Sequence, residues 1–313
     1  MIKPLAFAAL LACALPAFAN DTTAELAAGG LVLTKSDAIE MRSEDLYISR
    51  EQVRVRYTFL NSSDRDTIVR VAFPMPAIGG PGFFDGDVAI PVDGSDNFLG
   101  FSTRVDGKPI EMQVEHKAFA GAVDRTAWLR ANGIPLRPHA SEAETALAAL
   151  SPARRAEAVR LGLIDDNDRP AWELRTTYHW LQRFPAGKPV EIEHRYHPSV
   201  GATAGTLLGS DAADPDIARY CVDPPLLARL GAAAAKERHF TENWVDYILV
   251  TGGSWKKPIG SFRLVVDKGR ANDLVSFCGD GIRKIGPTQF EMRKTNWRPE
   301  RNLSVLFLSP WGQ

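Results

Sequence analysis

Cysteine, charge of one sign and long apolar runs are all scarce in this 313-residue sequence. Three cysteines are too few to build a disulfide-dense mini-domain. The 37 basic and 38 acidic residues give a net charge of −1, so we expect no nucleic-acid partner. No stretch reaches the roughly 18 consecutive apolar residues that a transmembrane segment needs. Hydrophobic residues nevertheless make up 45% of the chain, which excludes a disordered protein and predicts one or two globular domains.

The start of the chain has the three parts of a secretory signal peptide. Lys3 supplies the positive charge, residues 5–15 are apolar, and Ala17-Phe18-Ala19 matches an A-x-A cleavage site. We therefore expect residues 1–19 to be removed after Ala19, and the mature protein to lie in the periplasm or outside the cell. An alternative is lipidation at Cys13, because the preceding Leu-Leu-Ala resembles a lipoprotein processing site.

Removal of the signal peptide leaves an even pair of cysteines, Cys221 and Cys278. In an oxidising compartment such a pair is most simply a disulfide, and two buried free thiols are the alternative. A bridge that closes a loop of this size stabilises by on the order of 4 kcal/mol in the chain-entropy model. Neither cysteine has a histidine beside it in the sequence, which argues against a catalytic thiol.

Alternating apolar residues predict β structure in the first half of the mature chain. Residues 53–59 alternate, and residues 69–73 resume the alternation after turn-forming residues, so we expect a hairpin. Residues 98–105 and 110–114 predict a second hairpin, with Asp-Gly at its turn. Residues 77–97 form a long loop between these hairpins, and loops of this length are often functional.

Helical signals interrupt the strands at residues 141–163. Ser141 begins a capping-box pattern, and Ser151 precedes a proline at the first helical position. Gly162 stands where the second helical pattern stops. The sequence therefore predicts a two-helix insertion.

Residues 172–196 predict another hairpin, with Pro185-Ala186-Gly187 as its turn. In the expected register, His179 lies opposite Glu193, and His197 lies on the same outer face. A histidine oriented by a glutamate can act as an acid or a base, so these three are the candidate catalytic residues. The alternative is a solvated sheet face with cross-strand charge pairs. His194 falls on the apolar face and is expected to be a hydrogen-bonded core histidine.

The rest of the chain predicts a linker and a further set of strands. Residues 202–240 contain a Gly/Ala/Asp-rich stretch and a short helix, and residues 241–313 contain five short β runs. The predicted fold is therefore mainly β, with two β-sandwich-like domains at residues 20–201 and 241–313 and the two-helix insertion in the first.

Several segments carry a resemblance to a known family. They are VRVRYTFLNSS (53–63), VAFPMP (71–76), TTYHWLQRFPAGKPVEIEHRYHPSVG (176–201), YILVTGGSWKKPIGSFRLVVDKG (247–269) and VSFCGDGIRKIGPTQFE (275–291). These segments resemble an uncharacterised family of exported bacterial proteins, domain of unknown function 4424. The resemblance implies export and carries over no activity or catalytic residue. The first domain is also similar to the sandwich domain of vault proteins and inter-α-trypsin inhibitor heavy chains, which implies roles in structure and protein association.

The long loop holds the candidate binding residues. Phe83 and Phe84 either form an apolar tip that contacts a partner or tuck onto the sandwich. The acidic residues of the loop are Asp85, Asp87, Asp93 and Asp96. Carboxylates suit calcium, but their spacing matches no EF-hand, so a flexible acidic loop is the preferred interpretation.

Standard catalytic signatures are absent from the sequence. It has no G-x-S-x-G elbow, no H-E-x-x-H helix and no Walker phosphate loop, and we expect no cofactor and no metal centre. The leading function prediction is a non-catalytic exported protein that binds an unidentified envelope protein or glycan. One alternative is a hydrolase-like enzyme using His179, Glu193 and His197. The other is a carbohydrate-binding sandwich, which requires a row of exposed tryptophans; Trp180 is expected in the core.

Overall fold

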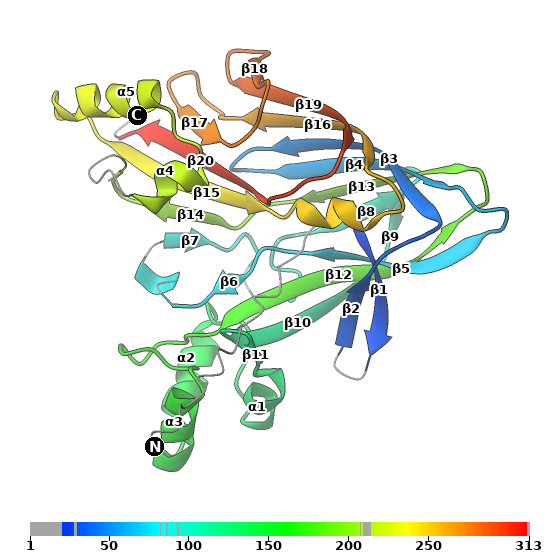
Figure 1. The fold of residues 1–313 in the computed structure, drawn as a ribbon. Helices are drawn as coiled ribbons and strands as arrows, with labels where there is room; N and C mark the ends of the chain where they lie inside the picture. Colours follow the sequence, from blue (N-terminus) through cyan, green and yellow to red (C-terminus); the bar gives the residue numbers. More distant parts are fainter. Residues whose placement is uncertain are drawn as a thin grey trace, which may run out of the picture.

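The computed structural model describes residues 21–27, 30–81, 83–85, 87–92, 94–206, 208 and 214–311. Its strands form three β-sheets and outnumber the short helices, so the mainly β prediction is confirmed (Figure 1). The helices are short, and none within the described ranges is both long and apolar enough to cross a membrane.

The first sheet has seven strands in the order β11-β10-β12-β5-β1-β2, with β6 beside β12. They are β1 (Thr22–Ala27), β2 (Gly30–Thr34), β5 (Thr67–Pro74), β6 (Ile78–Gly79), β10 (Gln113–Ala120), β11 (Val123–Asp124) and β12 (Glu173–Phe184). The long strand β12 organises this sheet, because it pairs with β10 on one side and with β5 on the other.

The second sheet has eight strands in the order β18-β19-β16-β3-β4-β13-β8-β9. They are β3 (Ile39–Ile48), β4 (Val53–Asn61), β8 (Ser102–Val105), β9 (Lys108–Ile110), β13 (Pro189–Tyr196), β16 (Ile259–Asp267), β18 (Arg283–Lys284) and β19 (Gln289–Trp297). The pair β3–β16 is parallel, with Ser43 opposite Ser261. The pairs β16–β19, β3–β4 and β4–β13 are antiparallel.

The third sheet has five strands in the order β17-β20-β15-β14-β7. They are β7 (Asp87–Ala89), β14 (Val200–Thr203), β15 (Phe240–Tyr247), β17 (Leu274–Phe277) and β20 (Leu303–Pro310). Its edge strand β17 leads directly into Cys278, which is bonded to Cys221 as predicted, with a distance of 2.10 Å between the two sulfur atoms.

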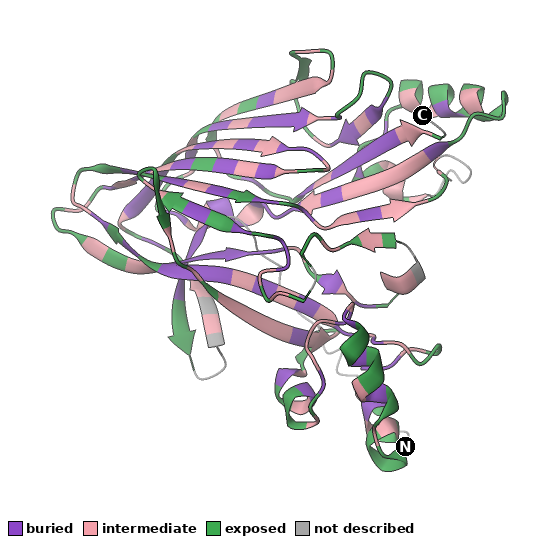
Figure 2. Cartoon of the chain, turned by 180° about the vertical axis from the view of Figure 1, so that it is seen from behind, coloured by how far each residue is buried: buried purple, intermediate pink, exposed green. Residues whose placement is uncertain are grey.

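Buried side chains of all three sheets meet in one apolar cluster, which includes Phe73 of the first sheet, Phe59 of the second and Phe307 of the third. Figure 2 shows the buried residues concentrated on strands throughout the body of the molecule. The strands before and after the predicted linker at 202–240 share sheets, since β16 pairs with β3 and β14 pairs with β15.

Three helices precede β12, which makes the insertion longer than predicted. They are α1 (Thr126–Ala131), α2 (Ser141–Ala148) and α3 (Pro152–Arg160), and they lie at one end of the first sheet (Figure 1). Ser151 caps α3 by accepting from the backbone N–H of Arg154 at 3.4 Å. Ser141 is the first residue of α2 and does not cap it, because Ala140 holds the cap position. The three helices pack around a small apolar core that includes Trp172, whose indole N–H donates to the Leu136 carbonyl.

The remaining helical segments lie in connections between strands. They are α4 (Pro215–Arg219), α5 (Pro224–Ala234) and the 3₁₀ turns η1 (Phe83–Asp85) and η2 (Val250–Ser254). In α4 and α5 a proline occupies the first turn, and Asp214 and Asp223 accept backbone N–H groups as caps.

Two of the three predicted hairpins are wrong. β4 belongs to the second sheet and β5 to the first, and likewise β12 belongs to the first and β13 to the second. Each short connection therefore crosses from one sheet to the facing one. Alternation specifies which face of a strand is buried, and both arrangements bury the same face, so the pattern does not distinguish them. The β8–β9 hairpin is confirmed, with positive φ at Asp106 and Gly107 as an Asp-Gly turn requires.

Candidate functional site

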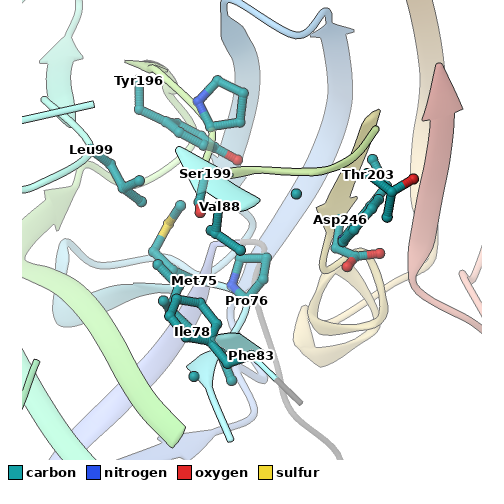
Figure 3. A pocket seen from close by; sticks show the side chains of 15 residues that line it. Met75, Pro76, Ile78, Phe83, Val88, Leu99, Tyr196, Ser199, Thr203 and Asp246 are labelled. Carbon is teal, nitrogen blue, oxygen red and sulfur yellow. The ribbon is translucent and has the colours of Figure 1, made fainter. Parts of the chain in front are cut away.

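A cavity of about 400 Å³ lies where the long loop, the β13–β14 connection and β15 come together (Figure 3). Its lining residues are Met75, Pro76, Ala77, Ile78, Gly79, Phe83, Val88, Leu99, Tyr196, Pro198, Ser199, Gly201, Thr203, Trp244 and Asp246. The loop predicted to be functional supplies Ile78, Phe83 and Val88 to this lining. The cavity is therefore the candidate site of the molecule.

One side of the cavity is apolar because of how the loop leaves β5. Proline at 74 and 76 ends the strand, and Gly79 then turns the chain with φ of 101°. A Cβ on Gly79 would lie 2.5 Å from the Trp172 carbonyl oxygen, so only glycine fits this close approach. The turn places Ile78 and Phe83 beside Met75, as Figure 3 shows.

The other side of the cavity is polar. Thr203 and Asp246 lie across from Met75 and Phe83, and the hydroxyl groups of Tyr196 and Ser199 complete the polar lining (Figure 3). Burial raises the pKa of Tyr196 well above its usual value, so this hydroxyl stays protonated. No lysine, arginine or histidine is among the described residues that line the cavity.

Asp246 is held in place from outside the cavity. Its Oδ1 accepts from the Ser304 hydroxyl at 2.5 Å, and its Oδ2 accepts from the Arg219 guanidinium at 2.9 Å. A carboxylate offers about four acceptor positions, so two remain for a group inside the cavity. The arrangement suits a ligand that presents a hydroxyl or amine donor to Asp246 and an apolar body to the loop.

The indole of Trp244 forms part of the wall because residue 201 has no side chain. A Cβ built on Gly201 would lie 2.1 Å from the Trp244 ring, which is far inside van der Waals contact. Gly201 and Trp244 are directly paired on β14 and β15. Nothing in the sequence pattern marked this pair, because glycine in this stretch was interpreted as linker composition.

The candidate catalytic residues do not come together. His179 lies in the first sheet, paired with Ala72, while Glu193 lies in the second sheet, paired with Arg56. The predicted register of His179 opposite Glu193 is wrong because β12 and β13 form no hairpin. His197 is exposed beyond the end of β13, where its Nδ1 lies 2.8 Å from the Glu51 carbonyl oxygen.

His179 and Glu193 each have a local partner instead. The Arg70 guanidinium donates to Nδ1 of His179 at 2.9 Å, and burial together with this cation lowers the pKa of His179. Burial raises the pKa of Glu193, but hydrogen bonds from Arg56 and Arg195 outweigh burial and hold the pKa below its usual value. Glu193 therefore belongs to a ladder of cross-strand charge pairs, which is the alternative interpretation of this face.

His194 is a buried core histidine, as predicted. Its Nε2 lies 3.0 Å from Asp21 Oδ1, and its Nδ1 lies 2.8 Å from Thr103 Oγ1. The order hydroxyl, imidazole, carboxylate is that of a nucleophile with its base and orienting group. The Thr103 side chain is 2% exposed and the other two are fully buried, so no substrate reaches them. Sequence reasoning missed Asp21 and Thr103, since neither lies near His194 in the chain.

The two acidic side chains of the loop that the structure describes, those of Asp87 and Asp96, belong to no group of metal-ligating residues. Asp87 is exposed on β7, and the side chain of Asp96 is 82% exposed. The side chain of Asp85 and all of Asp93 lie outside the described residues. Among the described residues no group of three or more metal-ligating side chains converges.

The aromatic residues of the loop and the tryptophans Trp172, Trp180 and Trp255 pack inward, whereas Trp311 is 69% exposed. Phe83 contacts the main core, and its ring lies edge-on to Phe84 with centroids 5.0 Å apart. The Arg169 guanidinium covers the Phe84 ring at 5.4 Å. Trp180 is 5% exposed, and Trp255 is 2% exposed. These tryptophans form no exposed row of the kind that a carbohydrate-binding sandwich requires.

The fold and the cavity together define a class: a three-sheet β protein whose candidate site is a cavity with an apolar and a polar side. The chain belongs to the family described as domain of unknown function (DUF4424), whose model matches residues 19–306. No curated protein matches the chain in sequence.

Among solved structures, the chain is similar to a protein from Legionella pneumophila subsp. pneumophila strain Philadelphia 1 that carries the provisional name of a nutrient binding protein. The two chains are 17% identical, the TM-score is 0.50, and the match covers 93% of this chain and 70% of the other. At this identity the likeness concerns the fold alone.

Proposed function

We propose that this protein is an exported binding protein for a small molecule with an apolar body and a hydrogen-bond donor at one end. The observation that carries the proposal is the cavity of about 400 Å³ with Met75, Ile78 and Phe83 on one side and Asp246 on the other. Known small-molecule sites have volumes of roughly 300–1,000 Å³ and few, well-placed polar groups. The provisional name of the Legionella protein agrees with a binding role.

The polar groups favour a neutral or cationic ligand. Asp246 presents acceptors, and the hydroxyls of Tyr196, Ser199 and Thr203 bond either way. An anion would meet the Asp246 carboxylate and would find no cationic side chain among the described residues of the lining, since Arg219 binds Asp246 from outside the cavity. An alcohol or an amine with a short hydrocarbon body is the ligand class that these groups recognise.

Export rests on the signal-peptide pattern of residues 1–19 and on the compartment that a disulfide requires. The bond between Cys221 and Cys278 persists in an oxidising environment such as the periplasm. The proposed location is therefore the periplasm or the exterior, with ligands drawn from that space.

A matched ligand panel tests the proposal. Primary alcohols, amines and carboxylates of equal chain length are added to the purified protein, and the midpoint of thermal unfolding is measured. A ligand at 100 times its Kd stabilises the native state by about 2.7 kcal/mol, so alcohols or amines should raise the midpoint and carboxylates should not. Asp246→Asn should weaken the amines most.

A cavity-filling variant and a matched surface control test the location of the site. Val88→Trp places an indole where the ligand would lie, whereas Val123→Trp adds the same ring at an exposed site on β11. Ligand stabilisation should disappear in the first variant and persist in the second. The proposal is wrong if no panel member stabilises the wild-type protein, or if Val88→Trp responds as the wild type does.

A further inference from the structure

The disulfide lies at the surface, although cross-links of this kind are often buried. Cys221 is exposed and Cys278 is partly exposed. Cys221 follows α4 with φ of 51°, and the Val222 N–H donates to the Ile217 carbonyl, which ends the helix as a glycine would. Both sulfur atoms border a groove distinct from the cavity described above.

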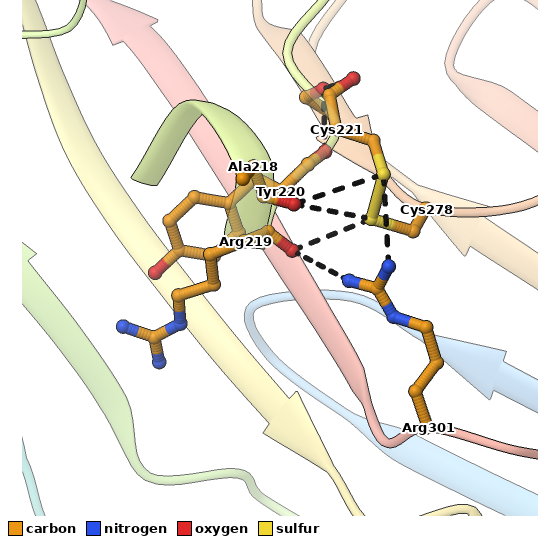
Figure 4. The surroundings of a disulfide bond; sticks show 7 residues. Ala218, Arg219, Tyr220, Cys221, Cys278 and Arg301 are labelled. Carbon is orange, nitrogen blue, oxygen red and sulfur yellow. Dashed lines mark hydrogen bonds between the residues drawn. A yellow bond between two sulfur atoms is a disulfide. The ribbon is translucent and has the colours of Figure 1, made fainter. Parts of the chain in front are cut away.

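A cation is fixed beside one of the two sulfur atoms. Nη1 of Arg301 lies 4.0 Å from Sγ of Cys221, and its Nη2 donates to the Arg219 carbonyl at 3.2 Å (Figure 4). A neighbouring guanidinium stabilises a thiolate and attracts an incoming one. Sγ of Cys278 lies 3.4 Å from the same carbonyl oxygen, which can accept from a thiol but not stabilise a thiolate. The Ala218 carbonyl oxygen lies 3.9 Å from Sγ of Cys221 and 3.8 Å from Sγ of Cys278, so the guanidinium of Arg301 is what distinguishes the two sulfur atoms. The reduced pair thus has a place for a thiolate at Cys221 and for a thiol at Cys278.

The groove beside the disulfide suits an extended polypeptide. It measures about 1040 Å³, and its apolar lining includes Leu249, Ile282, Phe290, Met292 and Trp297. Consecutive residues Val275, Ser276 and Phe277 of β17 also line it. Successive side chains of a strand point to opposite faces, so three in a row border a groove only along the edge of the strand. β17 is an edge strand of the third sheet, and such edges accept an added strand from a partner.

We propose that Cys221–Cys278 is an exchangeable disulfide, which oxidises a dithiol in an extended segment of another exported protein that lies in this groove. A thiolate of the segment attacks Sγ of Cys221, and Cys278 leaves as a thiolate that takes up a proton. The second cysteine of the segment, as a thiolate, then attacks the sulfur of the segment's first cysteine in the mixed disulfide. Cys221 leaves as a thiolate beside Arg301. The segment loses two electrons and two protons; the protein gains both electrons, Cys278 takes up one proton as a thiol, and the other proton goes to solvent while Cys221 remains a thiolate beside Arg301.

Kinetics with a defined probe test the proposal. The oxidised full-length mature protein is mixed with a reduced peptide that carries two cysteines in an alternating apolar sequence, and free thiols of the protein are counted over time. Arg301→Gln removes the cation beside Cys221. Its rate should fall several-fold, because the variant no longer has a cation that attracts the incoming thiolate and stabilises Cys221 as the leaving thiolate. Arg298→Gln is the matched control, because Arg298 lines the same groove and donates to the Gly253 carbonyl, not to sulfur.

A trapping experiment identifies the reacting sulfur. Cys278→Ser should accumulate a mixed disulfide between Cys221 and a single-cysteine version of the peptide, whereas Cys221→Ser should accumulate far less. Thermal unfolding of each variant confirms that it is folded. The proposal is overturned if the peptide reacts no faster than glutathione, if Arg301→Gln and Arg298→Gln react at the wild-type rate, or if the two single-cysteine variants trap equally.

Discussion

Replacement of Asp21 tests how the centre of this fold is held together. The Asp21 carboxylate is fully buried and lies 3.0 Å from His194 Nε2. The backbone carbonyl of Asp21 accepts from the Trp255 indole at 2.7 Å. Four aromatic rings surround His194 with centroids 4.9–5.8 Å away, from Tyr57, Phe73, Phe101 and Trp180. Water cannot replace the missing partner at such a site.

Asp21→Ala should therefore destabilise the protein by about 1–3 kcal/mol, the cost of leaving the buried His194 ring without this hydrogen-bond partner. At about 2–4 °C per kcal/mol this corresponds to a loss of roughly 2–12 °C in the midpoint of thermal unfolding. Urea unfolding of the mature chain measures the free energy directly. Asp64→Ala is the control, because the Asp64 side chain is 92% exposed and should leave the midpoint unchanged.

A second variant separates this hydrogen bond from the packing around it. Replacing both partners, Asp21→Val with His194→Met, removes both groups of the pair, and the Thr103 hydroxyl keeps its contact with Met112 Sδ at 2.7 Å, so the double variant should be more stable than Asp21→Ala alone. The reasoning would be refuted by a loss below about 1 kcal/mol for Asp21→Ala, or by a double variant as unstable as the two single changes summed.

Three further measurements follow from the structure. Hydrogen bonds from Arg293 and Arg263 lower the pKa of Glu291 from 4.5 to about 2. The stability that this carboxylate contributes is therefore present above pH 4.5 and is lost as the pH falls toward 2. The urea midpoints of the wild type and Glu291→Gln should differ at pH 7 and converge near pH 2, and a gap that stays constant would contradict this. Gly201→Ala should cost about 1–3 kcal/mol in urea unfolding and shift the tryptophan emission, because the new Cβ displaces Trp244; an unchanged spectrum and midpoint would show that the ring moves aside freely. Intact-mass measurement of the protein purified from periplasmic extract should show a chain that begins at residue 20, and a retained or lipidated Cys13 would overturn the signal-peptide prediction.

The sequence predicted the buried face of most strands but not their partners. Tyr178 and Trp180 on β12 and Ile192 and His194 on β13 all point into the core, as their alternation indicated. The short connection between these strands leads to the facing sheet rather than back along the same one. Since a hairpin and such a crossover bury the same side chains, the pairing depends on long-range contacts that a local pattern does not contain.

The candidate site shows the same division. The long loop was singled out by its length, and it does supply part of the cavity wall through Ile78 and Phe83. The polar side was not predicted, because Asp246 and Thr203 meet only through the pairing of β14 with β15. The predicted catalytic cluster does not form, because His179 and Glu193 would meet only if β12 paired with β13, and these strands lie in different sheets.

The parallel contact between β3 and β16 has a consequence for how the chain is made. β3 has β4 on one side, but its other edge stays open until residues 259–267 have been synthesised. Loop closure over such a distance is slow, and an uncovered strand edge is a place where chains aggregate. The nascent protein therefore exposes an incomplete second sheet for most of its synthesis, and a factor that holds unfolded chains would act on it during that interval.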